Sequence, residues 1–370
     1  MVNPQCIDIG NMLASSEPGL SDSQLSLVIQ PDSGQTYEVL TSLGFNVAPV
    51  ASQLLYKVVE DNELPDCFSE LGQRVAEVSQ TLSRFTLTRS ALDSKHLLVE
   101  FLDAQPLSNF VACYRYNWFL QLFLDNQEFF FEYQPIVEMP SGKVVAHECL
   151  VRALSAEGEY LSAGKLIEAA EATGLIHEFD QAARETCLEA IAALDTNSTF
   201  FINIIPNSIL NHPHFLDDTI HKMQQLGINP EQIVFELTEK EALNHRSKLA
   251  NAINKLRSRG FRIAVDDLYG DVASDHYLME LHPDIIKLDR RLVSGCGSYP
   301  MKQVLIKSLI TSAHEMNIEL IAEGLEDQED IDFCLAQGVD FGQGFGIARP
   351  HLLPHKKQIK LASFNRLQAM

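Results

Sequence analysis

Two adjacent carboxylates, Asp266 and Asp267, follow a short apolar run in the segment FRIAVDDLYGD. Two acids side by side at the end of a buried strand repel each other unless a cation lies close to them. Carboxylates without cysteine or histidine among them suit hard ions such as Mg²⁺ or Mn²⁺. The pair therefore predicts a metal site at the end of a strand.

Other polar residues stand at or near the ends of further apolar runs. They are Gln134, Glu148, Asn203, Glu236, Lys287, Asp289, Glu323 and Gln343. A single acid at such a position is usually a helix cap or a surface group, but several converging carboxylates repel strongly without cations between them. We expect two divalent ions here, the arrangement that promotes attack of water on a phosphodiester. Lys287 would orient that water or offset charge as it builds on the phosphate.

Two other candidates for chemistry are weaker. His212 and His214 in NHPHF lie in a predicted loop without supporting ligands, so we do not expect them to bind metal. Cys149 adjoins Glu148, and neighbouring side chains on a strand point to opposite faces. We therefore interpret Cys149 as a packing residue and not as a nucleophile.

The elements that must position these residues form a regular alternation from residue 129 onward. Short strand-like runs alternate with longer amphipathic segments, which implies parallel strands with helical crossovers. The runs are FFFEYQPIV, VVAHECLVR, FFINIIP, IVFELTE, RIAVDDL, DIIKLD, IELIAEG and VDFGQGFG. Such a series predicts a (β/α)₈ barrel, whose active site lies at the C-terminal ends of the strands. An open doubly wound sheet is the alternative, but no G-x-G-x-x-G follows an early strand.

The residues N-terminal to the barrel, 1–105, have the pattern of a smaller α/β or α+β domain. We expect this domain to have an unknown role, sensory or regulatory. We expect strands at Leu25–Ile29 and Leu97–Leu102, and helices around Thr36–Leu43, Val50–Val59 and Cys67–Leu82. Residues 106–128 predict a linker helix that either packs or acts as a lever between the domains. The barrel is expected at 129–355, followed by a C-terminal tail at 356–370.

Composition limits the partners. The chain of 370 residues has 28 basic and 50 acidic residues and a net charge of −22, which argues against binding DNA, RNA or anionic membranes. Its 7 cysteines form no C-x-x-C pair, as expected for reduced thiols. We find no signal peptide, and no apolar stretch approaches the roughly 20 residues that span a bilayer. We therefore expect a cytoplasmic protein.

The segment from about 129 to 350 resembles the EAL phosphodiesterases, which hydrolyse cyclic di-GMP to linear pGpG. The resemblance rests on ordered motifs, and the signature stands as HECLVR with Cys149 in place of alanine. The motifs are YQPIV, ECLVR, FINIIP, FELTE, VDD, IKLD, AEGLE and QGFG. The resemblance implies a modified (β/α)₈ barrel whose first strand is antiparallel to the rest. It also implies a homodimer.

The resemblance assigns roles residue by residue. The implied ligands of two Mg²⁺ or Mn²⁺ ions are Glu148, Asn203, Glu236, Asp266 and Asp267. Lys287 is implied near the catalytic water, Glu323 near metal-bound water, and Glu239 as the residue that ties down the loop after the aspartate pair. The implied contacts to cyclic di-GMP are Gln134, Leu150, Arg152, Asp289, Glu326 and Gln343.

One loop departs from the family pattern Phe-Gly-x-Gly-Tyr-Ser-Ser that follows the second aspartate. Residues 268–274 read LYGDVAS, so Tyr269 and Asp271 replace glycines, which permit backbone angles that side chains resist. The principal hypothesis is a cyclic di-GMP phosphodiesterase regulated by its N-terminal domain. The alternatives are a weak or inactive cyclic di-GMP receptor that signals through a protein partner, and an interaction module that binds no nucleotide.

Overall fold

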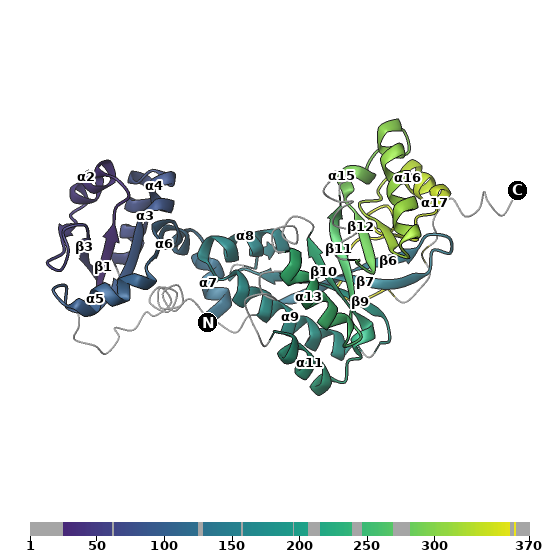
Figure 1. The fold of residues 1–370 in the computed structure, drawn as a ribbon, viewed down its shortest axis with the longest axis horizontal. Helices are drawn as coiled ribbons and strands as arrows, with labels where there is room; N and C mark the ends of the chain where they lie inside the picture. Colours follow the sequence, from purple (N-terminus) through teal and green to yellow (C-terminus); the bar gives the residue numbers. More distant parts are fainter. Residues whose placement is uncertain are drawn as a thin grey trace, which may run out of the picture. The chain divides into compact units, whose positions relative to one another are not determined.

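The structure is a computed structural model. It describes residues 25–60, 63–124, 129–156, 158–194, 196–205, 215–238, 246–268, 282–355 and 359. The chain divides into two compact units, whose elements are labelled in Figure 1. The N-terminal unit comprises Met1–Glu128 and Ala153–Phe179, and the barrel unit comprises Phe129–Arg152 and Asp180–Met370. The barrel unit thus begins at residue 129, whereas residues 153–179 group with the N-terminal unit.

Among its described residues, the N-terminal unit holds an antiparallel sheet with strand order β2-β3-β1-β4-β5. The strands are β1 (Leu25–Gln30), β2 (Asn46–Val47), β3 (Leu55–Val59), β4 (Arg84–Thr88) and β5 (Gln105–Pro106). The helices between them are α2 (Gly34–Ser42), α3 (Leu64–Arg74), α4 (Glu77–Leu82) and α5 (Lys95–Glu100). This chain order and strand order form a split βαβ, or ferredoxin-like, arrangement. The central strand β1 is buried at five consecutive positions, so it is apolar almost throughout.

The strand predicted at Leu97–Leu102 is wrong, because this segment forms α5 and the 3₁₀ turn η2 (Phe101–Asp103). The hydroxyl of Ser94 accepts a hydrogen bond from the backbone N–H of His96 and thereby caps α5. Leu97 then packs into a cluster with residues of β1 and of the β2–β3 connection. A short apolar run is compatible with a strand and with a helix, so its periodicity alone does not determine which of the two forms.

The helix predicted around Val50–Val59 is also wrong, because Leu55–Val59 forms β3 and pairs with β1 along its whole length. The pairing buries Leu55 and Val59 and overrides the local helical pattern. The strand predicted at Leu25–Ile29 and the helix around Thr36–Leu43 are confirmed by β1 and α2. The helix predicted at Cys67–Leu82 is present as two helices, α3 and α4.

The remaining elements of the N-terminal unit bring distant segments together. They are α6 (Leu107–Arg115), α7 (Asn117–Leu124), β8 (Tyr160–Leu161) and α8 (Ala163–Thr173). The described part of the predicted linker helix, residues 107–124, therefore forms two helices that break at Tyr116 instead of one. Both α6 and α7 contact α8, and the rings of Phe119 and Phe179 lie 6.0 Å apart. The segment after β7 is therefore part of the packing of α6 and α7.

In the described part of the barrel unit, eight strands close into a ring in the order β6-β14-β13-β12-β11-β10-β9-β7. They are β6 (Phe130–Glu138), β7 (Val144–Leu154), β9 (Thr199–Asn203), β10 (Ile233–Thr238), β11 (Arg262–Leu268), β12 (Ile285–Leu288), β13 (Glu319–Ala322) and β14 (Phe341–Gly342). The helices are α9 (Ile176–Ala193), α11 (Phe215–Leu226), α13 (Arg246–Arg257), α15 (Arg290–Val293), α16 (Pro300–Glu315) and α17 (Gln328–Gln337), with the 3₁₀ turn η3 (Pro230–Gln232). The predicted barrel is confirmed.

The first barrel strand runs against the others, as the resemblance implied. Strand β6 pairs antiparallel with β7 on one side and with β14 on the other. The remaining pairings, from β7 through β9 to β14, are parallel. Because seven strands share one direction, their C-terminal ends gather at one end of the barrel.

A single apolar layer fills the barrel interior. Each of seven strands contributes one buried side chain to it: Ile136, Ala146, Phe201, Val234, Ala264, Ile285 and Ile321. Two larger clusters hold outward-facing strand residues together with residues of the surrounding helices. Cys149 lies in one of these outer clusters beside Cys187 and Phe200. The prediction that Cys149 is a packing residue is therefore confirmed.

Candidate active site

The polar residues form the next layer above the apolar one, because side chains two residues apart on a strand share a face. Each stands two positions beyond an inner residue, toward the C-terminal ends of the parallel strands. The pairs are Glu148 with Ala146, Asn203 with Phe201, Glu236 with Val234, Asp266 with Ala264, Lys287 with Ile285, and Glu323 with Ile321. On antiparallel β6 the order reverses, so Gln134 precedes Ile136 and pairs with Glu148. The register of the barrel therefore assembles this layer.

Lys287 lies at the centre of the polar layer and is fully buried. Its Nζ lies 2.7 Å from Glu323 Oε1, 2.8 Å from Glu236 Oε1, 3.3 Å from Glu148 Oε2 and 3.4 Å from Asp266 Oδ1. Four carboxylates thus share one ammonium, and we call these five residues the carboxylate cluster. The cluster carries more negative than positive formal charge, which is costly in a buried place.

Glu148 accepts hydrogen bonds from two amide side chains. Gln343 Nε2 donates to its Oε2 at 2.6 Å, and Asn203 Nδ2 donates to its Oε1 at 3.2 Å. Burial raises the pKa of Glu148, but the charge of Lys287 and these hydrogen bonds outweigh burial and lower it below 4.5. Glu148 is therefore ionised at neutral pH.

Two other acids respond in the opposite direction. Burial raises the pKa of Glu236 and of Glu323 well above 4.5, against the opposing charge of Lys287, and nearby acids raise each of them further. Burial lowers the pKa of Lys287, but the charges of Asp266, Glu148, Glu236 and Glu323 outweigh burial and raise it well above 10.5. The ammonium is therefore retained, and the uncompensated charge falls on the acids.

Glu236 shows whether a metal ion suits this site. Both its oxygens are buried and accept no hydrogen bond of normal geometry from the described residues, although Lys287 Nζ lies 2.8 Å from Oε1. Buried polar oxygens need partners, and carboxylates with the Asn203 amide are donors that Mg²⁺ and Mn²⁺ prefer. The donor set therefore fits such ions. Across the described residues, however, no three His, Cys, Asp or Glu side chains are arranged to hold a metal as they stand, and Lys287 lies between the acids.

The residues implied to contact the ligand lie around the carboxylate cluster and differ in burial and in hydrogen-bond partners. Gln134 is buried opposite Glu148, while Leu150 is half-buried on β7. Arg152, near the end of β7, forms an ion pair with Glu132 in which Nε lies 2.9 Å from Oε2. The structure therefore brings Gln134 and Gln343 to the cluster, whereas Arg152 is engaged with a neighbouring acid.

Two implied ligand contacts pair with adjacent arginines of α15. Asp289 caps α15 by accepting the backbone N–H of Arg291, and its carboxylate also receives the guanidinium of Arg291 at 2.7 and 3.0 Å. Glu326 is exposed, and its Oε1 lies 3.0 Å from the guanidinium of Arg290. Neither arginine was predicted as a partner of these acids. The carboxylates of Asp289 and Glu326 are thus held in place before any ligand contact.

Several predicted residues lie outside the described part of the chain. These are Glu239, His212, His214 and residues 269–274 of the departing loop. The backbone of Asp267 belongs to β11, where the pairing with β12 shifts register between Val265 and Leu268. The side chain of Asp267 is not among those described.

The sequence analysis missed a buried ion pair on α9. Arg184 Nη1 lies 2.7 Å from Asp180 Oδ2, and both side chains are almost fully buried. The other oxygen, Asp180 Oδ1, accepts the backbone N–H of Ile205 at 2.9 Å. Asp180 thus anchors the chain two residues after Asn203. The only signal in the sequence was an Asp and an Arg four residues apart on a predicted helix.

Comparison with known proteins places the barrel in a family. The family model described as "EAL domain" matches residues 118–350. The chain is 30% identical over 233 residues to "Probable cyclic di-GMP phosphodiesterase PdeG" of Escherichia coli, covering 61% of this chain and 45% of that protein. It is 32% identical over 238 residues to "Cyclic di-GMP phosphodiesterase PdeB" of Shewanella oneidensis, covering 62% and 27%. The match thus spans less than half the length of these relatives.

Solved structures share the fold. The Xanthomonas citri FimX EAL domain, in complex with c-diGMP, has a TM-score of 0.61 at 20% identity and covers 66% of this chain and 96% of that one. The EAL enzyme Bd1971, in a form with cAMP and cyclic-di-GMP bound, has a TM-score of 0.61 at 22% identity and covers 86% and 82%. At these identities the likeness concerns the fold alone.

Proposed function

Because this chain belongs to the EAL domain family, we propose that its barrel unit hydrolyses cyclic di-GMP to linear pGpG with two Mg²⁺ or Mn²⁺ ions. The observation that supports this most is the carboxylate cluster, where acids from separate strands meet around Lys287 at the C-terminal end of the barrel. Relatives named as cyclic di-GMP phosphodiesterases, at about 30% identity, support the substrate.

The proposed ligands of the ions are Glu148, Asn203, Glu236, Asp266 and Asp267. When bound, the ions supply an activated water and stabilise the entering and leaving oxygens of the phosphodiester. Glu236 enters this role with two buried oxygens, of which Oε1 lies 2.8 Å from Lys287 Nζ. Glu148 enters it ionised, because Lys287 and two hydrogen-bond donors outweigh burial and lower its pKa.

Lys287 keeps its proton, since the surrounding acids raise its pKa well above 10.5 despite burial. Its N–H groups therefore donate to the attacking oxygen or to charge that develops on phosphate. Glu323 Oε1 lies 2.7 Å from Nζ and orients the ammonium. Outside the described residues, Glu239 is proposed to tie down the loop that follows the aspartate pair.

The proposed contacts to cyclic di-GMP are Gln134, Leu150, Arg152, Asp289, Glu326 and Gln343. Arg152 must exchange Glu132 for a phosphate oxygen, and a guanidinium can make two parallel bonds to phosphate.

A turnover assay tests the proposal. Purified full-length chain is incubated with cyclic di-GMP in Mg²⁺ or Mn²⁺, and the products are separated by chromatography. We expect pGpG from the wild type and from Glu189→Gln, an exposed control on α9, and intact substrate from Glu148→Gln. Intact substrate with wild type in both metals, at high enzyme concentration, would overturn the proposal. Calorimetric binding without turnover would select the receptor alternative, which the LYGDVAS loop motivates.

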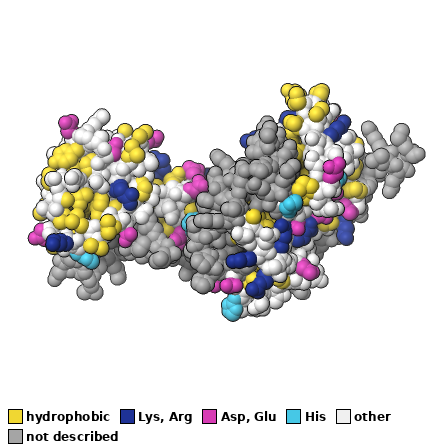
Figure 2. Space-filling model, in the orientation of Figure 1, with side chains coloured by type: hydrophobic (Ala, Val, Ile, Leu, Met, Phe, Trp, Pro, Cys, Tyr) yellow, Lys and Arg dark blue, Asp and Glu magenta, His cyan; other side chains and the backbone are white. Residues whose placement is uncertain are grey.

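We also propose that the N-terminal unit regulates turnover, with a protein as a possible partner. Large apolar side chains are exposed on this unit, among them Val78, Leu82 and Leu102, and Figure 2 shows hydrophobic surface on the face in view. Exposed apolar surface often marks an interaction site. Equal turnover by the full chain and by a chain lacking residues 1–105 would contradict this role.

The oligomeric state completes the proposal. We propose a homodimer, which light scattering at several concentrations would detect as twice the chain mass; a constant single-chain mass would contradict it. The described helices include none with the length and apolar character required to cross a membrane.

A further inference from the structure

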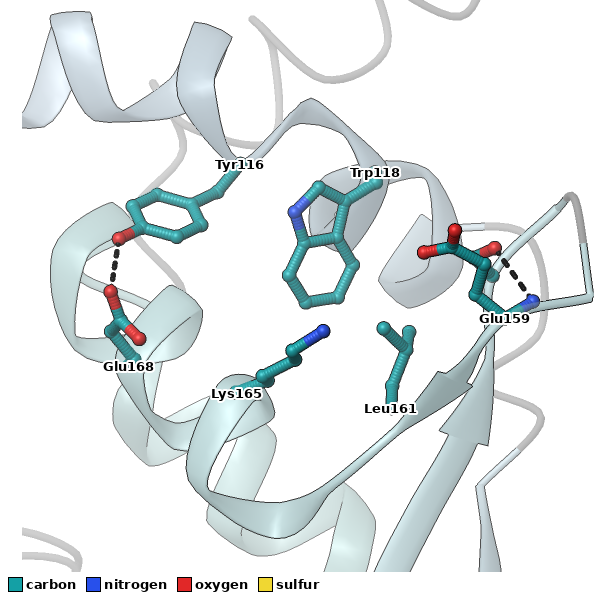
Figure 3. Close-up of a pocket in the computed structure, with 7 residues that line it drawn as sticks. Tyr116, Trp118, Glu159, Leu161, Lys165 and Glu168 are labelled. Atoms are coloured by element: carbon teal, nitrogen blue, oxygen red, sulfur yellow. Dashed lines mark hydrogen bonds between the residues drawn. The ribbon is translucent and has the colours of Figure 1, made fainter.

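A pocket of about 330 Å³ lies within the N-terminal unit, and none of its lining residues belongs to the carboxylate cluster. Its walls come from the start of α7, from the turn between β7 and β8, from β8 and from α8. The lining residues are Tyr116, Trp118, Ser155, Glu159, Leu161, Lys165 and Glu168, which Figure 3 draws. The helix break at Tyr116 and the β7–β8 hairpin together create this hollow.

One side of the pocket is apolar and well fixed. The indole of Trp118 meets the rings of Phe119 and Tyr116 edge-on, at centroid distances of 5.9 and 6.5 Å. Leu161 is buried beneath it, and Figure 3 shows the indole above Leu161 and Lys165. Such a wall suits an apolar or aromatic group of a ligand.

The other side carries charges of both signs. Lys165 and Glu159 are exposed, and neither side chain has an ion-pair or hydrogen-bond partner among the described residues. Glu168 is held in place, because the hydroxyl of Tyr116 donates to its Oε1 at 2.7 Å. This hydrogen bond is the main reason that the pKa of Tyr116 is raised, so the hydroxyl stays a donor. The pocket therefore presents one ammonium and two carboxylates beside an apolar wall.

We propose that this pocket binds a zwitterionic amino acid with an apolar or aromatic side chain. A phosphorylated or otherwise anionic ligand would meet two carboxylates, and a purely cationic ligand would meet Lys165. A zwitterion places its ammonium near Glu159 and Glu168 and its carboxylate near Lys165, while its side chain covers Trp118 and Leu161. The volume of about 330 Å³ lies at the lower end of the range for ligand pockets, roughly 300 to 1,000 Å³, which suits a ligand the size of an amino acid.

Trp118 makes the test direct, because it is the 1 tryptophan of the whole chain. The full-length protein is titrated with L-phenylalanine and its tryptophan fluorescence is recorded at an excitation that phenylalanine and tyrosine do not absorb. Phenethylamine, which lacks the carboxylate, and 3-phenylpropionate, which lacks the amine, are the matched probes. We expect saturable binding of L-phenylalanine and at least about tenfold weaker binding of each probe. Calorimetry repeats the titration, so that a fluorescence change is not required.

Substitutions in the pocket test which charged side chains contribute to binding of L-phenylalanine. Lys165→Met and Glu168→Gln should each weaken L-phenylalanine about tenfold, while Lys95→Met, an exposed control on α5, should not. Circular dichroism confirms that each variant is folded. The absence of L-phenylalanine binding by both methods would overturn the inference. It would also be overturned if phenethylamine bound as tightly, or if Lys165→Met had no effect.

Discussion

Replacing Lys287 by methionine removes the one cation of the carboxylate cluster while keeping a side chain of similar length. Four carboxylates lie within 3.4 Å of its Nζ, and the lysine side chain is fully buried. Removal of one partner from a buried charge pair costs about 3–5 kcal/mol, because the remaining charge is left uncompensated. For a unit of this size that corresponds to a fall in the unfolding temperature on the order of 10 °C.

The loss of stability caused by Lys287→Met should become smaller as the pH falls. The folded pKa of Lys287 lies well above 10.5, so its stabilisation is complete below pH 10.5 and disappears only as the pH rises through the folded value. Glu236 and Glu323 have raised pKa values, and both rise further without the ammonium. As the pH falls they take up protons and the repulsion among the acids decreases. The difference between Lys287→Met and wild type should therefore shrink in acid.

Chemical denaturation followed by circular dichroism, in metal-free buffer at several pH values, measures this difference in the free energy of unfolding. Lys255→Met, on the exposed face of α13, is the control and should unfold together with wild type. The reasoning would be refuted if Lys287→Met lost less than about 1 kcal/mol at neutral pH. A loss that grew as the pH fell would refute the assignment of charge in the cluster.

Three further changes test other parts of the molecule. Gly324 has φ +62°, and a Cβ there would lie 2.3 Å from Arg290 Cγ. Gly324→Ala should therefore lower the free energy of unfolding by about 1–2 kcal/mol or more. If Arg290→Ala in the same chain restored none of the lost stability, the steric explanation would be contradicted. Asp180→Asn should cost about 3 kcal/mol in denaturation, because it removes the buried negative charge that lies 2.7 Å from the guanidinium of Arg184, and an unchanged midpoint would contradict this. Burial raises the pKa of Asp32, but hydrogen bonds from neighbouring hydroxyls outweigh it and lower it below 3.8. The contribution of Asp32 to the free energy of unfolding is therefore present above pH 3.8 and is lost as the pH falls through the folded pKa. Asp32→Asn should make stability depend less on pH in acid unfolding followed by Trp118 fluorescence, and equal pH dependence in variant and wild type would contradict this.

The barrel was predictable from the alternation of strand-like and helical segments, and its polar layer follows from the period-2 spacing along each strand. Once Ile285 is buried inside the barrel, Lys287 must point to the same interior, one step closer to the C-terminal end. The same alternation of side chains explains why Cys149, one residue after Glu148, packs on the outer face of the barrel with Phe200. Local sequence pattern thus sufficed wherever the barrel forces each strand to face inside and outside alternately.

Other features depend on contacts that no local pattern contains. The segment Leu97–Leu102 has the pattern of a strand, but the burial of Leu97 in the cluster with Val28 and the cap at Ser94 favour a helix. The grouping of residues 153–179 with the N-terminal unit depends on packing of α8 against α6 and α7. The pairing of Asp289 with Arg291 required knowledge of where α15 begins. These features arise from tertiary structure, which outweighs the preferences of short segments.

Titration of the protein with Mn²⁺, followed by electron paramagnetic resonance of the free ion, tests most directly whether the carboxylate cluster is a metal centre. We expect saturable loss of the free Mn²⁺ signal with wild type, and at least about tenfold weaker binding after Glu236→Gln, since both oxygens of Glu236 are buried among the acids of the cluster. Equal Mn²⁺ binding by wild type and Glu236→Gln, or no binding by either, would contradict the account.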